Sequence, residues 1–85
     1  MRVKPHVRLY HAPDCHLCER ALSSLTELRR RAEFELEVVD ITGDSELEAR
    51  YREWLPVVEI DGERAFVYHL PQEAFLRKVS QTPAE

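Results

Sequence analysis

The sequence lacks several features that other classes of protein need. No apolar run approaches the ~18 residues of a membrane-spanning helix. The first eight residues carry positive charge but are not followed by the apolar stretch of a secretory signal. Basic side chains number 12 against 16 acidic ones, so a generally basic nucleic-acid surface is not expected. We therefore expect a cytoplasmic protein that binds neither membranes nor nucleic acid.

Cysteine and glycine are also scarce, with two of each. Two cysteines are too few for the disulfide framework of a small secreted fold. Gly43 and Gly62 each mark a turn between patterned segments. The 85 residues are too few for two cores, and 44% hydrophobic with 33% charged residues is a soluble globular balance. The prediction is a monomeric single domain over 1–85, with an ordered core at about 6–79 and a frayed end over 80–85.

Hydrophobic periodicity in the first half predicts a strand, a helix and a second strand. Apolar residues alternate over 7–10 and again from 34 to 38, a run that continues into 39–41. Between them, residues 15–32 show helical spacing, with Asp14 placed to cap the helix and three arginines, 29–31, at its far end. Such a unit implies parallel strands joined by a right-handed crossover.

The second half predicts a helix, a hairpin and a last helix. Ser45 and Glu48 have the spacing of a capping box. Leu47, Tyr51 and Trp54 then share one helical face that we interpret as core. Pro56 ends this helix because the residue before a proline is pushed out of the helical region.

An Asp-Gly pair at 61–62, between strands at 57–60 and 63–68, predicts a tight hairpin. Tyr10 and Tyr68 fall in strand patterns and are interpreted as packing residues. Pro71 suits the first turn of a helix that buries Phe75, Leu76 and Val79. The order is therefore β-α-β-α-β-β-α, an α/β fold with one mixed four-stranded sheet flanked by helices.

The segment Cys15-His16-Leu17-Cys18 is the strongest functional signal. The first cysteine falls at a helix start, where unpaired N–H groups and the helix dipole favour a thiolate. The second is one turn along, close enough to attack a mixed disulfide formed on the first. At the junction of a strand and a helix, this spacing favours a redox pair.

Other interpretations of the same cysteines stay open. They could be buried hydrophobic residues, or half of a zinc site that His6, His11 or His16 would have to complete. Haem attachment requires a histidine where the sequence has Glu19. His16 either stabilises the thiolate or is a solvated residue, and Trp54 could line the rim of the site instead of the core.

Together, the element order, Cys15-His16-Leu17-Cys18 and the later Trp54-Leu55-Pro56-Val57 resemble the glutaredoxin-like members of the thioredoxin superfamily. The likeness spans about residues 6–79, and the short bacterial proteins with a Cys-His-Leu-Cys segment are the most similar. It implies a thioredoxin fold, Cys15 as nucleophile and Cys18 as resolving thiol. It also implies a cis peptide bond before Pro56, with the Leu55 backbone free to pair with an extended substrate beside His16 and Leu17.

The sequence departs from typical glutaredoxins at three places. They have Pro-Tyr between the cysteines, where this chain has His16-Leu17. They have Val or Thr before the cis-proline, where this chain has Leu55. After the fourth strand they carry the Gly-Gly and Asp that bind the glutathione carboxylate, whereas residues 69–73 here contain no glycine. Redox chemistry is therefore expected to carry over better than glutathione binding, which we expect to be weak.

The leading hypothesis is a cytosolic thiol–disulfide oxidoreductase without a bound cofactor or metal. Its partners would be protein or peptide disulfides, with glutathione or a thioredoxin reductase-type system as electron donor. Two alternatives use the same residues: a zinc or iron–sulfur module, and a non-catalytic thioredoxin-fold interaction domain.

Overall fold

The computed structural model describes residues 4–80 and shows the β-α-β-α-β-β-α order that the sequence predicts. The elements are β1 (His6–His11), α1 (His16–Leu28), β2 (Glu35–Asp40), α2 (Ser45–Tyr51), the 3-10 turn η1 (Arg52–Trp54), β3 (Val57–Ile60), β4 (Glu63–Val67) and α3 (Gln72–Ser80). The expected fraying over 80–85 falls outside the described residues, except for Ser80, which ends α3.

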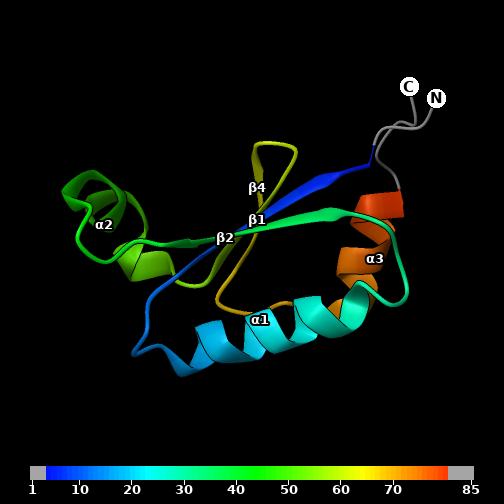
Figure 1. Ribbon diagram of the computed structural model, residues 1–85, viewed down its shortest axis with the longest axis horizontal. Helices are drawn as coiled ribbons and strands as arrows, with labels where there is room; N and C mark the ends of the chain where they lie inside the picture. The colour runs from blue at the N-terminus through cyan, green and yellow to red at the C-terminus, as the bar shows by residue number, and fades with distance from the viewer. Residues whose placement is uncertain (1–3, 81–85) are drawn as a thin grey trace.

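The four strands form one mixed sheet in the order β2-β1-β3-β4. Figure 1 shows β1, β2 and β4 above α1. β1 pairs with β2 in parallel and with β3 antiparallel. β3 and β4 form the predicted hairpin, in which Asp61 and Gly62 have φ of 53° and 85°. Two successive positive φ angles define the type I′ turn that Asp-Gly favours. Both the parallel unit and the hairpin are therefore confirmed.

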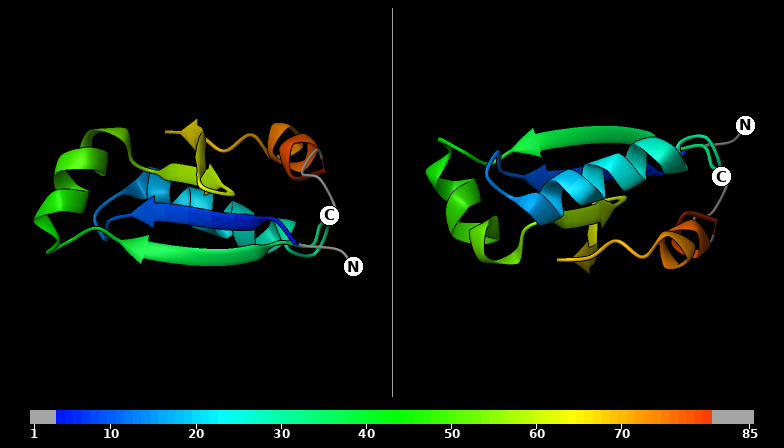
Figure 2. Two further views of the ribbon diagram at one scale, coloured as in Figure 1. Left: turned by 90° about the horizontal axis from the view of Figure 1, so that it is seen from above. Right: turned by 90° about the horizontal axis from the view of Figure 1, so that it is seen from below.

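One face of the sheet packs on α1 and α3, which lie beside each other (Figure 2). Val7, Leu9 and Val58 from the sheet are buried there against Leu25 of α1 and Phe75 of α3. Val79 is also buried, as predicted, whereas Leu76 is only partly buried. This core holds α1 against the sheet and so fixes the direction in which its first turn points.

The other face of the sheet is divided between a small core and a charged surface. Near the C-terminal end of β1, Tyr51 of α2 stacks on Tyr10 with ring centroids 4.0 Å apart. Closer to the N-terminal end of β1, the Arg8 guanidinium lies 3.1 Å from the Glu37 carboxylate and 4.0 Å from the Glu59 carboxylate. Hydrogen bonds to Tyr10 and Glu37 raise the pKa of Arg8, and His6 lies 3.0 Å from Glu37. Half-exposed pairs of this kind stabilise a fold only weakly.

The end of α1 and the start of α2 differ from the sequence-based expectation. α1 ends at Leu28, so the arginines at 29–31 follow the helix instead of forming its last turn. α2 is capped by Asp44, one residue before the predicted Ser45. The Asp44 carboxylate accepts hydrogen bonds from the N–H groups of Glu46 and Leu47, both 3.1 Å.

Glu48 still reaches back, but to the N–H of Gly43 at 3.1 Å, and this bond lowers the pKa of the glutamate. Asp44 is the N-cap instead of Ser45 because Asp44 is the residue with extended φ and ψ at which the chain enters the helix. An aspartate at this position caps a helix as well as a serine does.

Replacing the observed cap should cost more stability than replacing the predicted one. We expect Asp44→Ala to lower the free energy of unfolding by about 1 kcal/mol, since two helix N–H groups lose their acceptor. Ser45→Ala is the matched control and should change it much less. Urea denaturation of the three proteins measures the difference, and an equal or larger loss with Ser45→Ala would contradict the assignment.

Candidate active site

The junction between β1 and α1 holds the cysteine pair. Cys15 itself is the N-cap of α1, with extended φ of −116° and ψ of 107°. Its Sγ accepts a hydrogen bond from the Cys18 N–H at 3.2 Å. An N–H at a helix start favours negative charge on the atom it contacts. The prediction that Asp14 caps α1 is therefore wrong, because Cys15 occupies the cap position.

The two cysteines differ strongly in accessibility. Cys15 is half-buried, whereas Cys18 is only 1% exposed, as expected for a residue one turn into the helix. Burial, followed by the hydrogen bond with Cys15, raises the pKa of Cys18 to about 12. Cys18 is thus a protonated thiol at neutral pH, and Cys15 is the sulfur that a large molecule can reach.

The loop before β3 lies against the cysteines. Leu55 and Val57 belong to the same buried cluster as Cys18, and Cys15 packs on that cluster. Pro56, between them, is fully buried, and the Leu55–Pro56 bond is cis, as the resemblance implied. The structure therefore brings together four residues that the sequence analysis selected from two distant segments.

His16 and Leu17 complete the predicted site on its outer side. Both are exposed, Leu17 by 37%, so a large apolar side chain faces solvent beside the cysteines. On the other flank, the Asp14 carboxylate is exposed and lies 3.8 Å from the Arg52 guanidinium. Arg52 also binds Glu48 at 3.1 Å, so the negative charge next to Cys15 is partly offset by a cation held from the end of α2.

Trp54 and Tyr68 form an exposed aromatic pair. Each is 40% exposed, and their ring centroids are 6.0 Å apart. The interpretation of Trp54 as core was wrong, because η1 follows α2 and carries Trp54 out to the surface. The alternative, in which Trp54 lines the rim of the site, stays a prediction.

Tyr68 was also misread as a strand residue that packs inside. β4 ends at Val67, and Tyr68 has φ of 68°, a left-handed conformation that a bulky side chain rarely adopts. The His69 N–H donates to the Val67 carbonyl at 2.7 Å, which closes a tight γ-turn around Tyr68. The Tyr68 hydroxyl donates to the Glu53 carbonyl at 3.1 Å, and its N–H to the Pro56 carbonyl at 3.0 Å.

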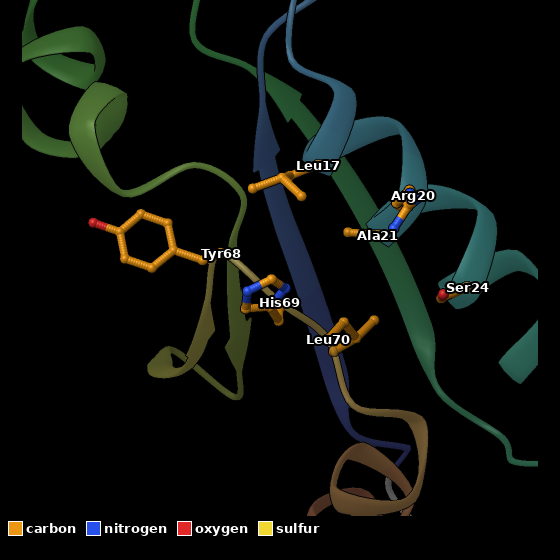
Figure 3. Close-up of a pocket in the computed structure, with 7 residues that line it drawn as sticks. All are labelled: Leu17, Arg20, Ala21, Ser24, Tyr68, His69 and Leu70. Carbon is orange, nitrogen blue, oxygen red and sulfur yellow. The ribbon is translucent and has the colours of Figure 1, made fainter.

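A pocket of about 210 Å³ lies between α1 and the segment after β4 (Figure 3). Its α1 side consists of Leu17, Arg20, Ala21 and Ser24, and the other side of Tyr68, His69 and Leu70. The sequence analysis missed it. The four α1 residues have the spacing i, i+3, i+4, i+7, which places them on one helix face, but nothing local in the sequence shows that 68–70 lies opposite.

The structure bears on the other candidate roles as well. His6 begins β1 and is paired with Glu37, at the opposite end of the strand from the cysteines. Within residues 4–80, no three His, Cys, Asp or Glu side chains are grouped so that they could hold a metal ion. In the same part of the chain, no helix has the length and apolar character needed to cross a membrane.

Known structures share this architecture. Protein Ne2328 from Nitrosomonas europaea superposes with a TM-score of 0.78 at 27% identity, covering 93% of this chain and 95% of that one. Protein XcR50 from X. campestris gives 0.73 at 27% identity, covering 91% and 99%. Fasciola hepatica thioredoxin gives 0.65 at 18% identity, covering 96% and 84%, which shows the fold alone. The fold is thus thioredoxin-like.

The family is shown by the sequence itself. Residues 6–80 match the family described as "Glutaredoxin-like domain (DUF836)". A comparison with curated proteins gave no match. The chain therefore belongs to the glutaredoxin-like domain family, and its cysteine pair on a thioredoxin-like fold is consistent with a redox function.

The difference between the cysteines can be measured directly by alkylation. In the reduced protein at neutral pH, we expect iodoacetamide to label Cys15 first. Cys18 should be labelled at least about tenfold more slowly, because it is buried and its pKa is raised. Peptide mapping by mass spectrometry gives both rates. Labelling in urea is the control, since both thiols should then react similarly. Faster labelling of Cys18 in the folded protein would contradict the assignment.

Proposed function

We propose that this protein is a thiol–disulfide oxidoreductase in which Cys15 is the nucleophile and Cys18 the resolving thiol. The observation that carries the proposal is the Cys15 cap: an accessible sulfur accepts an N–H at the start of α1, and a buried thiol lies three residues on. A redox pair needs this asymmetry, since one sulfur must meet the substrate and the other must wait beside it.

In the first step, the Cys15 thiolate attacks one sulfur of a substrate disulfide. A bond forms between Cys15 and that sulfur, the substrate S–S bond breaks, and the second substrate sulfur leaves as a thiolate that takes up a proton. The N–H of Cys18 stabilises negative charge on Cys15 before the attack.

In the second step, Cys18 loses its proton and attacks Cys15 Sγ. The mixed disulfide breaks, the substrate leaves with two thiols, and the protein keeps the Cys15–Cys18 disulfide. Two electrons have passed from the protein to the substrate. Once Cys15 is part of a mixed disulfide, its sulfur can no longer be a thiolate. The hydrogen bond from the Cys18 thiol to that thiolate, which helps to raise the pKa of Cys18, is then lost.

The surroundings of Cys15 favour a peptide as substrate. Leu17, two residues after Cys15, and Trp54, two residues before Pro56, are large apolar side chains that are exposed, and exposed apolar side chains of this kind are typical of an interaction site. The Leu55 backbone, next to Pro56, is the group we propose to pair with an extended substrate. We further propose a cytoplasmic location, where thiols are kept reduced, with glutathione or a thioredoxin reductase-type system as electron donor.

Two cysteine variants test the mechanism. Cys15→Ser should reduce the rate of insulin disulfide reduction to the uncatalysed level, because the attacking sulfur is gone. Cys18→Ser should instead accumulate a covalent adduct on Cys15, because the mixed disulfide cannot be resolved, and intact-mass spectrometry detects it. Circular dichroism checks that both variants remain folded. Full activity of Cys15→Ser would contradict the role of Cys15. Insulin reduction by the unchanged protein at only the uncatalysed rate would favour a non-catalytic interaction domain, and stoichiometric zinc or iron in the purified protein would favour a metal-binding module.

Glutathione should be a poor substrate compared with a protein disulfide. A carboxylate binds well at a helix start that offers free N–H groups, but α3 begins after Pro71, which has no N–H, and carries Glu73 in its first turn. We expect reduction of a glutathione mixed disulfide to be at least several-fold less efficient, in kcat/KM, than reduction of a protein disulfide. Equal efficiency would show that the missing Gly-Gly segment is not needed.

A further inference from the structure

We propose that the pocket between α1 and the segment after β4 selects peptide disulfides that carry an acidic side chain two residues from the reacting cysteine. Arg20 and His69 would bind the carboxylate. The inference rests on the proposed function, since it names the substrate class of the same site.

The charge of the lining favours an anion. None of the residues around the pocket is a carboxylate, Arg20 is a cation, and His69 is a cation when it is protonated. Arg20 forms no salt bridge with any carboxylate of residues 4–80, whereas Arg31 binds Glu73 and Arg52 binds Asp14 and Glu48.

Within the described part of the chain, the Arg20 guanidinium thus has no carboxylate partner, and a neutral His69 ring still has one N–H to donate. The pocket is therefore lined by positive charge although the net charge of the chain is −4.

The distance from the nucleophile sets the position of the acidic residue. Arg20 lies five residues after Cys15 along α1, which is about 7.5 Å at the rise of an α-helix. In an extended peptide, side chains two residues apart point the same way and are about 7 Å apart. A substrate that runs along α1 from a cysteine bonded to Cys15 would therefore bring the side chain two residues away to the level of Arg20 along the helix axis.

The size and walls of the pocket suit a single side chain. Its volume of about 210 Å³ is below the range of roughly 300–1,000 Å³ that holds a whole small molecule. Leu17, Ala21 and Leu70 provide apolar walls for the methylene groups of a glutamate.

The turn at Tyr68 keeps the pocket open. Figure 3 shows the Tyr68 ring directed away from α1, whereas the His69 ring lies on the side of the pocket. The positive φ of Tyr68 turns the backbone between these two side chains. The hydrogen bond from the Tyr68 hydroxyl to the Glu53 carbonyl keeps the ring in its orientation.

The test uses three peptides, each as a disulfide between two identical copies. The peptides differ only at the two positions that lie two residues before and two residues after the cysteine, where all three carry a different residue: glutamate, glutamine or lysine. Each reacts with pre-reduced protein in a single turnover, so the protein dithiol supplies both electrons and no other reductant is needed. Chromatography measures the release of peptide thiol. We expect the glutamate peptide to react roughly two- to fivefold faster than the glutamine peptide at low salt, which is the gain of one partly exposed ion pair, and the lysine peptide to be the slowest.

Arg20→Gln should remove the preference for glutamate. Arg30→Gln is the matched control, because it removes the same charge from an exposed position beyond the far end of α1 and should leave the preference intact. Equal loss in both variants would mean that only the overall field matters and would overturn the proposal. So would equal rates for glutamate and glutamine peptides in the unchanged protein.

Two further outcomes separate this proposal from the function on which it rests. If no peptide disulfide reacts, the proposed oxidoreductase activity fails and the pocket assignment with it. If all three react at one rate, the activity stands and only the pocket assignment fails. Glutathione disulfide is the last substrate: reaction as fast as that of the glutamate peptide, with the same dependence on Arg20, would make the pocket a glutathione site and overturn the choice of an acidic peptide.

Discussion

The pairing of β1 on both of its edges is the constraint on which the rest of the molecule depends. β1 is the only strand bonded both to the parallel β2 and to the antiparallel β3 among the described residues. Val7 and Leu9 point into the core with α1 and α3, whereas Tyr10 points into the core with α2. A shift of register by one residue would exchange these faces. The same pairing that builds both cores therefore fixes the end of β1, and with it the position of Cys15.

Cys15 has a structural role and a proposed chemical role that use the same hydrogen bond. Its sulfur accepts the Cys18 N–H in the place where a helix ordinarily has a serine, aspartate or asparagine oxygen. Such an oxygen would cap α1 at least as well, so the fold does not require cysteine at this position. A cysteine here gains what a serine lacks, a sulfur that can become a thiolate beside helix N–H groups. The choice of residue is thus better explained by chemistry than by stability.

The sequence predicts most of the fold because its patterns are long and mutually consistent. Periodicity gives each strand and helix, and Asp61-Gly62 gives the hairpin. The errors at the two helix starts concern choices between neighbours. Asp14 and Cys15, like Asp44 and Ser45, are adjacent residues that can both cap a helix, and the point where the chain enters the helix selects one of them. The pocket could not be predicted, because only tertiary packing brings the segment after β4 to the face of α1 that carries Arg20.

The bend at Tyr68 joins parts of the site that are separate in sequence. A bulky residue keeps a left-handed conformation only where its surroundings over-determine it, and three hydrogen bonds do so here. They link Tyr68 to Pro56 and Glu53, and His69 back to Val67. The loop that lies against the cysteines and the wall of the pocket are consequently one unit, held together without glycine. Because the backbone of Leu55 and the side chain of His69 are both positioned by this unit, the proposed pairing of a substrate with Leu55 and the proposed binding of its side chain at His69 would both depend on the turn at Tyr68.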